Sequence, residues 1–179
     1  MKADAVQRNA GPNAVPAVMH TPRPRFFEWR DCWTLEVGFM DDDHRLLADV
    51  LNRIARDFGD WSGPPGLPGV ATGRSASDLL GALDDLGQHV RGHFQREEDV
   101  MRTLDYRDYP AHKSEHDILL AEYAVMVRGI RASGRETLDI STLETLKDWL
   151  MGHVLEVDRQ LAEFLKNPPE PETRTTPDE

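Results

Sequence analysis

The sequence predicts an all-α protein whose four long helices form an antiparallel, up-down four-helix bundle. Apolar residues recur at intervals of three and four in four separate stretches, as expected for amphipathic helices. Pro- and Gly-containing segments separate these stretches, and we find no strand-like alternation of useful length. At 179 residues the chain suits one domain with additional terminal segments.

The expected helices follow one another with recognisable start and stop signals. The first covers about 41–57 and the second about 77–104, with a Gly-, Pro- and Ser-rich loop at 59–75 between them. Pro110 suits the first turn of a third helix, which extends to about 132 and stops near Gly134. The segment Ser141–Glu144 matches a capping box and predicts the start of a fourth helix, which ends before Pro168.

The domain organisation follows from composition at the two ends. Residues 1–25 contain several prolines and are expected to form an extended arm, residues 26–167 the bundle, and residues 168–179 a disordered acidic tail. The net charge of −11 argues against nucleic-acid binding. The sequence contains no run of about 18 apolar residues, so we expect no membrane insertion. The N-terminus has no apolar signal region. A single cysteine, Cys32, fits a cytoplasmic location.

Seven potential metal ligands recur at helical spacings, and five of them are histidines from a total of seven in the chain. His93 and Glu97 are four residues apart, as are His112 and His116, so each pair shares one face of its helix. The full set comprises His44, His93, Glu97, His112, His116, His153 and Asp158. Placed on four helices of one bundle, these side chains predict a dinuclear metal centre.

One spacing does not fit a regular helix. Asp158 follows His153 by five residues, which places the two side chains about 140° apart around an α-helix. Either the two residues serve different sides of the site, or the helix is locally distorted, for example by a π-type turn.

The predicted ligand set is rich in nitrogen donors, and no Glu-x-x-His pair occurs at the predicted ligand positions. Such a site stabilises high oxidation states less, which favours reversible binding over strong oxidation. Among the neighbouring polar residues, we expect Glu98 to be solvated, Asp42 and Asp43 to face solvent at a helix start, and His89 not to be a ligand.

The motifs resemble those of the hemerythrin family, in particular its single-domain bacterial members. The resemblance covers about residues 27–166 and rests on Phe27-Glu28-Trp29, Val37-Gly38, Met40-Asp41-x-x-His44, His93-Phe94-x-x-Glu97-Glu98-x-x-Met101, His112-x-x-x-His116 and Trp149-Leu150-x-x-His153-x-x-x-x-Asp158. It implies two iron ions in a non-haem centre. One iron would take His112, His116 and His153, the other His44 and His93. Glu97 and Asp158 would bridge them together with an oxo or hydroxo oxygen.

The resemblance also implies reversible dioxygen binding at an open coordination position. Five apolar residues next to the ligands are expected to line the dioxygen pocket: Leu47, Phe94, Trp149, Leu150 and Val154. The resulting prediction is a non-enzymatic protein that stores dioxygen or delivers it to an oxygen-consuming enzyme. Two alternatives remain: a dioxygen or redox sensor acting through a signalling partner, and a di-iron peroxide or nitric oxide reductase.

Overall fold

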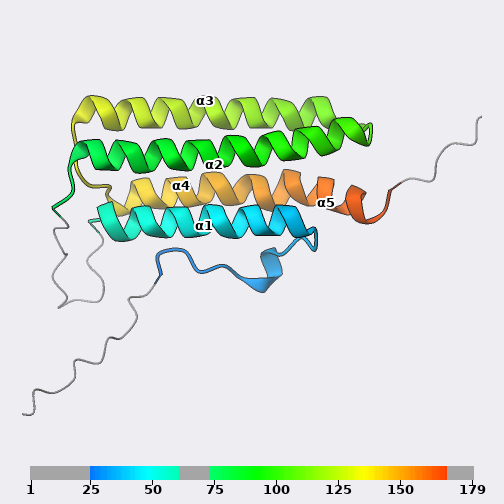
Figure 1. The fold of residues 1–179 in the computed structure, drawn as a ribbon, viewed down its shortest axis with the longest axis horizontal. Coiled ribbons are helices and arrows are strands. Elements are labelled where there is room, and N and C mark those ends of the chain that lie inside the picture. Colours follow the sequence, from blue (N-terminus) through cyan, green and yellow to red (C-terminus); the bar gives the residue numbers. More distant parts are fainter. Residues whose placement is uncertain (1–24, 61–72, 169–179) are drawn as a thin grey trace, which may run out of the picture.

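A computed structural model describes residues 25–60 and 73–168. All but the last residue of the predicted arm, most of the 59–75 loop, and the tail after residue 168 lie outside these residues. Four long helices form the bundle: α1 (Gly38–Phe58), α2 (Ala76–Thr103), α3 (Tyr109–Ser133) and α4 (Ile140–His153). A five-residue π-helical segment, η2 (Val154–Asp158), and α5 (Arg159–Lys166) continue α4 (Figure 1).

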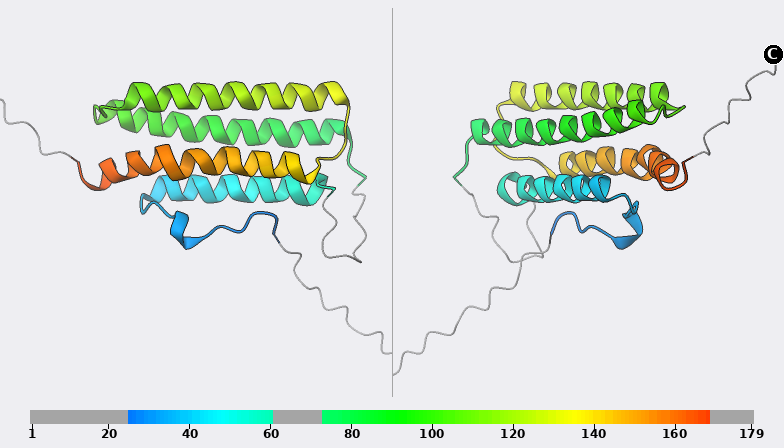
Figure 2. Two further views of the ribbon diagram at one scale, coloured as in Figure 1. Left: turned by 180° about the vertical axis from the view of Figure 1, so that it is seen from behind. Right: turned by 45° about the vertical axis from the view of Figure 1, so that its right-hand side comes forward.

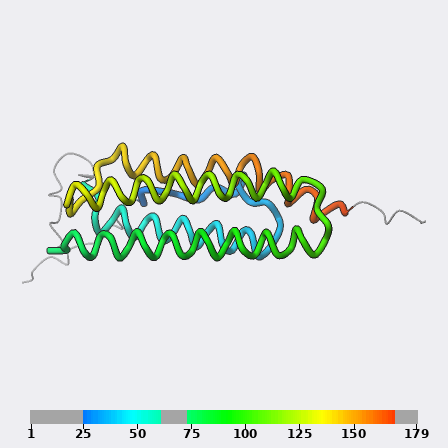
Figure 3. The backbone as a smooth tube through the Cα atoms, turned by 90° about the horizontal axis from the view of Figure 1, so that it is seen from above, coloured from blue at the N-terminus to red at the C-terminus, as the bar shows by residue number. Residues whose placement is uncertain are grey.

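The helices alternate in direction and confirm the antiparallel four-helix bundle (Figures 1 and 2). α2 packs against both α1 and α3, and α4 packs against α1, so the bundle closes around a shared interior (Figure 3). The short 3-10 helix η1 (Asp31–Trp33) belongs to a segment that runs back along α1 (Figure 1). Two hydrogen bonds between Asn52 and the backbone of Phe27 attach this segment to α1.

The helix ends have clear local causes. Ser75 and Asp78 form a capping box at the start of α2, and Pro110 lies in the first turn of α3. Gly134 ends α3 at φ 63°, a left-handed conformation that glycine adopts without a steric penalty.

The predicted capping box at Ser141–Glu144 is wrong, because α4 begins at Ile140 with Asp139 as its N-cap. Asp139 Oδ1 accepts hydrogen bonds from the Thr142 N–H and from the hydroxyls of Ser141 and Thr142. Asp139 lies two residues before Ser141, and its carboxylate caps the helix in place of the Ser141 hydroxyl.

The apolar interior forms two clusters, one on either side of a polar layer. The larger contains residues such as Leu51, Leu83 and Leu146. The smaller lies toward the other end and includes Met40, Met101 and Leu161. On α1 and α2 the histidine and carboxylate positions fall between residues of the two clusters, so packed side chains separate this layer from both ends of the bundle. Among the described residues, no helix is both long and apolar enough to cross a membrane.

Candidate metal centre

All seven predicted ligand residues are buried in the polar layer, and their potential donor atoms converge. They fall into two groups, in each of which the donor atoms lie within 4.8 Å of one another. One group contains His112, His116 and His153, and the other contains His44 and His93. Glu97 and Asp158 belong to both groups.

Each shared carboxylate directs one oxygen to each group. Asp158 Oδ1 lies 2.9 Å from His153 Nε2 and 3.3 Å from His112 Nε2. Its other oxygen, Oδ2, lies 3.1 Å from His44 Nε2 and 3.6 Å from His93 Nε2. Bridging geometry of this kind is what a carboxylate between two neighbouring ions requires.

The two carboxylate oxygens of Glu97 are divided between the two donor groups in the same way. Its Oε2 lies 3.3 Å from His116 Nε2 and 3.5 Å from His112 Nε2, whereas Oε1 lies 3.6 Å from His93 Nε2. Two donors at right angles around one ion, each bonded at about 2.1 Å, would be roughly 3.0 Å apart. The observed spacings are close to this value, so the cluster has the dimensions of a two-ion site.

A π-helical turn brings Asp158 into the site. η2 begins directly after His153 and ends at Asp158, so the extra residue per turn compensates for the five-residue spacing. In a regular α-helix the two side chains would point about 140° apart. Here His153 Nε2 and Asp158 Oδ1 are in contact at 2.9 Å, which confirms the local distortion that was one of the two sequence-based alternatives.

The charges in the cluster are interdependent. Burial alone would raise the pKa of Asp158, but His153, His112 and His44 hold it well below its ordinary value. The pKa of Glu97 is likewise lowered by neighbouring histidines, against the effects of burial and of Asp158. Conversely, although burial opposes it, Glu97, Asp158 and Asp43 raise the pKa of His93 to about 10. Against the effect of burial, Asp158 and Glu97 likewise raise the pKa of His112 to about 9.

The unpaired polar atoms show that the cluster fits metal ions. Both oxygens of Glu97 are buried without a hydrogen-bond partner, and so are Nε2 of His112, His116 and His153. A buried carboxylate that lacks hydrogen bonds is costly unless a cation or metal compensates it. Divalent ions between these atoms would satisfy the donors of both groups at once.

Two residues expected to face solvent contact histidines of the cluster instead. Glu98 is buried, and its Oε1 lies 3.1 Å from His116 Nδ1, so the prediction that it is solvated is wrong. α2 has neighbours on both sides, and Glu98 faces α3 while Glu97 faces the interior. Asp43 is also largely covered, because α1 begins at Gly38 and places Asp43 in its second turn, 3.4 Å from His93 Nδ1.

The other neighbours behave as expected. Asp42 is exposed, and His89 belongs to neither donor group. Trp29, part of the Phe27-Glu28-Trp29 motif, stacks on His44 with the ring centroids 6.1 Å apart.

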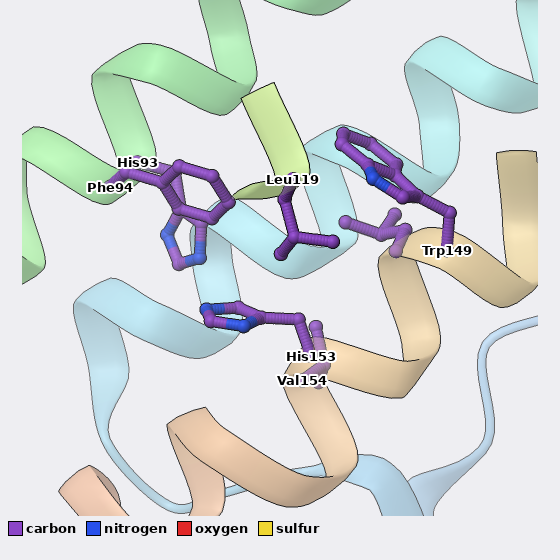
Figure 4. A pocket seen from close by; sticks show the side chains of 7 residues that line it. His93, Phe94, Leu119, Trp149, His153 and Val154 are labelled. Atoms are coloured by element: carbon purple, nitrogen blue, oxygen red, sulfur yellow. The ribbon is translucent and has the colours of Figure 1, made fainter. Parts of the chain in front are cut away.

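An apolar pocket adjoins the cluster (Figure 4). Four of the five predicted dioxygen-pocket residues line it, namely Phe94, Trp149, Leu150 and Val154, together with His93, His153 and Leu119. Leu47 does not line this pocket; it is buried in the larger apolar cluster. Leu119 was not predicted, although its position three residues after His116 was a usable signal.

The fold and the donor arrangement define a four-helix protein with a buried histidine and carboxylate cluster that is suitable for two metal ions. Comparison with known proteins agrees: the hemerythrin HHE cation binding domain matches residues 36–165. The chain is 32% identical to a bacteriohemerythrin of Methylococcus capsulatus over 123 residues, covering 69% of this chain and 83% of that protein. It is 27% identical to a myohemerythrin of Sipunculus nudus, covering 78% and 94% of the two chains.

The solved structures give the same result. A wild-type hemerythrin superposes with a TM-score of 0.60 at 28% identity and covers 76% of this chain and 95% of that one. The chain belongs to the hemerythrin family.

Proposed function

We propose that this protein binds dioxygen reversibly at a non-haem di-iron centre, for storage or for delivery to an oxygen-consuming enzyme. The observation that supports this most is the division of donors into a three-histidine and a two-histidine group sharing two carboxylates. His112, His116 and His153 would hold one iron, His44 and His93 the other, and Glu97 and Asp158 would bridge them. A pair of ferrous ions would supply the two electrons that dioxygen binding at such a centre requires.

The unequal donor groups support binding at one side. With both carboxylates shared, the group of His44 and His93 offers one protein donor fewer than the other group. The ion held there would keep a position for an external ligand. His93 lies at the edge of the apolar pocket, which would give dioxygen a path to that position.

The pocket itself supports a small apolar ligand and the exclusion of water. Phe94, Leu119, Leu150 and Val154 offer no hydrogen-bonding side-chain atoms, and Trp149 offers only its indole N–H. Apart from the two candidate ligands His93 and His153, no lining side chain is a general acid or base. The pocket therefore favours binding without turnover, which supports a non-enzymatic role over a peroxide or nitric oxide reductase.

Oxygen titration tests this proposal. The iron-loaded protein is reduced without air, and its visible absorption is followed while dioxygen is added and then removed. We expect an absorption band that appears with dioxygen and disappears on its removal over repeated cycles. Immediate and permanent oxidation would contradict a storage role and favour a redox sensor or a reductase.

A further inference from the structure

Two of the five cluster histidines contact a carboxylate through the ring nitrogen that points away from the cluster. His116 Nδ1 lies 3.1 Å from Glu98 Oε1, and His93 Nδ1 lies 3.4 Å from Asp43 Oδ2. One such pair belongs to each donor group. A carboxylate at this nitrogen favours the tautomer whose Nε2 is free to bind a metal, and it fixes the plane of the ring.

The two carboxylates differ in how they are held. Asp43 is bound in a bidentate manner by Arg96, with Nε 2.7 Å from Oδ2 and Nη2 2.7 Å from Oδ1. The cationic neighbour of Glu98, in contrast, is Lys113, whose Nζ is 3.9 Å away. A planar guanidinium paired with both oxygens of a carboxylate restricts its rotation, whereas a single ammonium does not.

The Arg96–Asp43 pair extends from the surface to the cluster. The Arg96 side chain is 49% exposed, that of Asp43 is 14% exposed, and that of His93 is 1% exposed. Arg96 therefore lies outside the centre and belongs to neither donor group, yet it determines where Asp43 Oδ2 can lie. Asp43 in turn lies against the ring whose opposite nitrogen faces the cluster.

We propose that Arg96 is a positioning residue for the two-histidine side of the centre. Acting through Asp43, it holds His93 with Nδ1–H toward α1 and Nε2 toward the shared carboxylates. This inference rests on the proposed function, because it assumes that His93 Nε2 binds a metal ion. It adds Arg96 to the residues that shape the centre, although Arg96 would contact neither metal nor dioxygen.

A simpler role for the same pair would be to tie α1 to α2, since Asp43 belongs to the first helix and Arg96 to the second. The two roles differ in what happens when the charges are exchanged. The double variant Asp43→Arg/Arg96→Asp keeps an attraction between the helices but removes the carboxylate from His93.

Zinc binding provides a test that does not depend on dioxygen. Zinc affinities for the two steps are measured by chelator competition on the full chain, with circular dichroism to confirm folding. We expect wild-type protein to bind two zinc ions. Asp43→Asn and Arg96→Gln should each weaken one of the two steps by roughly 10- to 100-fold and leave the other unchanged. The charge-exchanged variant should bind zinc as weakly at this step as the single variants. Arg96→Lys, which lacks the planar guanidinium, should have an affinity between those of Arg96→Gln and wild type.

The control is Arg131→Gln. Arg131 is 57% exposed and its Nη2 lies 4.0 Å from Asp84 Oδ1, so it forms another exposed arginine–carboxylate pair between two helices. Neither residue belongs to the donor groups, so both zinc steps should keep their wild-type affinity. In zinc-loaded protein labelled with 15N-histidine, His93 should show a slowly exchanging Nδ1–H that is broadened in Arg96→Gln.

The outcomes separate the two proposals. If wild-type protein binds two zinc ions and Arg96→Gln binds them equally well, the positioning role is wrong and the two-metal centre stands. Wild-type affinity in the charge-exchanged variant would also overturn it, in favour of a tie between helices. If wild-type protein binds fewer than two ions, the proposed function and the positioning role both fail.

Discussion

Substitution of Gly87 by alanine should destabilise the protein, although alanine is the better helix former. Gly87 lies inside α2, where α3 comes close: a Cβ at this position would be 2.9 Å from Tyr123 Cε1. Tyr123 is not free to move, because its hydroxyl donates a hydrogen bond to the Leu83 carbonyl at 2.6 Å and its ring stacks on Trp149. The absent side chain therefore makes room for a residue that supports the pocket wall.

Two opposing effects set the magnitude. Overpacking of a buried contact costs about 1–3 kcal/mol. Alanine gains about 0.8–1.0 kcal/mol over glycine in a helix interior. The net destabilisation of Gly87→Ala is then roughly 0–2 kcal/mol. Gly81→Ala is the matched control, because Gly81 is exposed on the same helix and a Cβ there would have nothing within 4 Å.

Thermal and urea unfolding of the metal-free variants provide the assay. Gly81→Ala should be more stable than wild type by about 0.8–1.0 kcal/mol. The two variants should therefore differ by about 1–3 kcal/mol, or roughly 2–12 °C in Tm for a domain of this size. Equal stability of the two variants would refute the reasoning, since it would mean that the Tyr123 ring moves aside at no cost.

Three further predictions concern the neighbours and protons of the centre. Glu98→Ala should lower metal affinity by roughly 10- to 100-fold in chelator competition, whereas Glu98→Gln keeps an acceptor for His116 and should lose less; equal losses would contradict the contact. Tyr123→Phe should cost about 1 kcal/mol in urea unfolding, because the Leu83 carbonyl loses a partner, and an unchanged midpoint would argue against that bond. Metal binding should release protons at pH 7, because carboxylates raise the pKa of His93 to about 10 and of His112 to about 9, and metal binds only the neutral rings. Apparent affinity should then increase as the pH is raised toward these values; calorimetry in buffers of different ionisation enthalpy checks this, and a pH-independent affinity would count against it.

Much of this architecture could be predicted from the sequence. Apolar periodicity predicted four helices, and the i, i+4 spacings placed His93 with Glu97 and His112 with His116. The five-residue gap before Asp158 indicated a distortion, and η2 is that distortion. These features depend on residue spacing along one helix, and that spacing can be read directly from the sequence.

The errors concern which side of a helix meets which neighbour. Glu98 looked solvated because only one face of α2 was assigned to the interior, whereas α2 has partners on two sides. Asp43 looked exposed because the start of α1 was placed three residues late. The contact of Asp43 with Arg96 joins residues 53 positions apart, a distance over which the sequence gives no pairing signal.

The central claim is that seven side chains hold two metal ions between a three-histidine and a two-histidine group. Anomalous scattering from crystals of the iron-loaded protein tests it most directly. We predict two iron peaks per chain, one nearest His112, His116 and His153 and one nearest His44 and His93, with Glu97 and Asp158 between them. A single peak, or two peaks that do not share these carboxylates, would contradict the account.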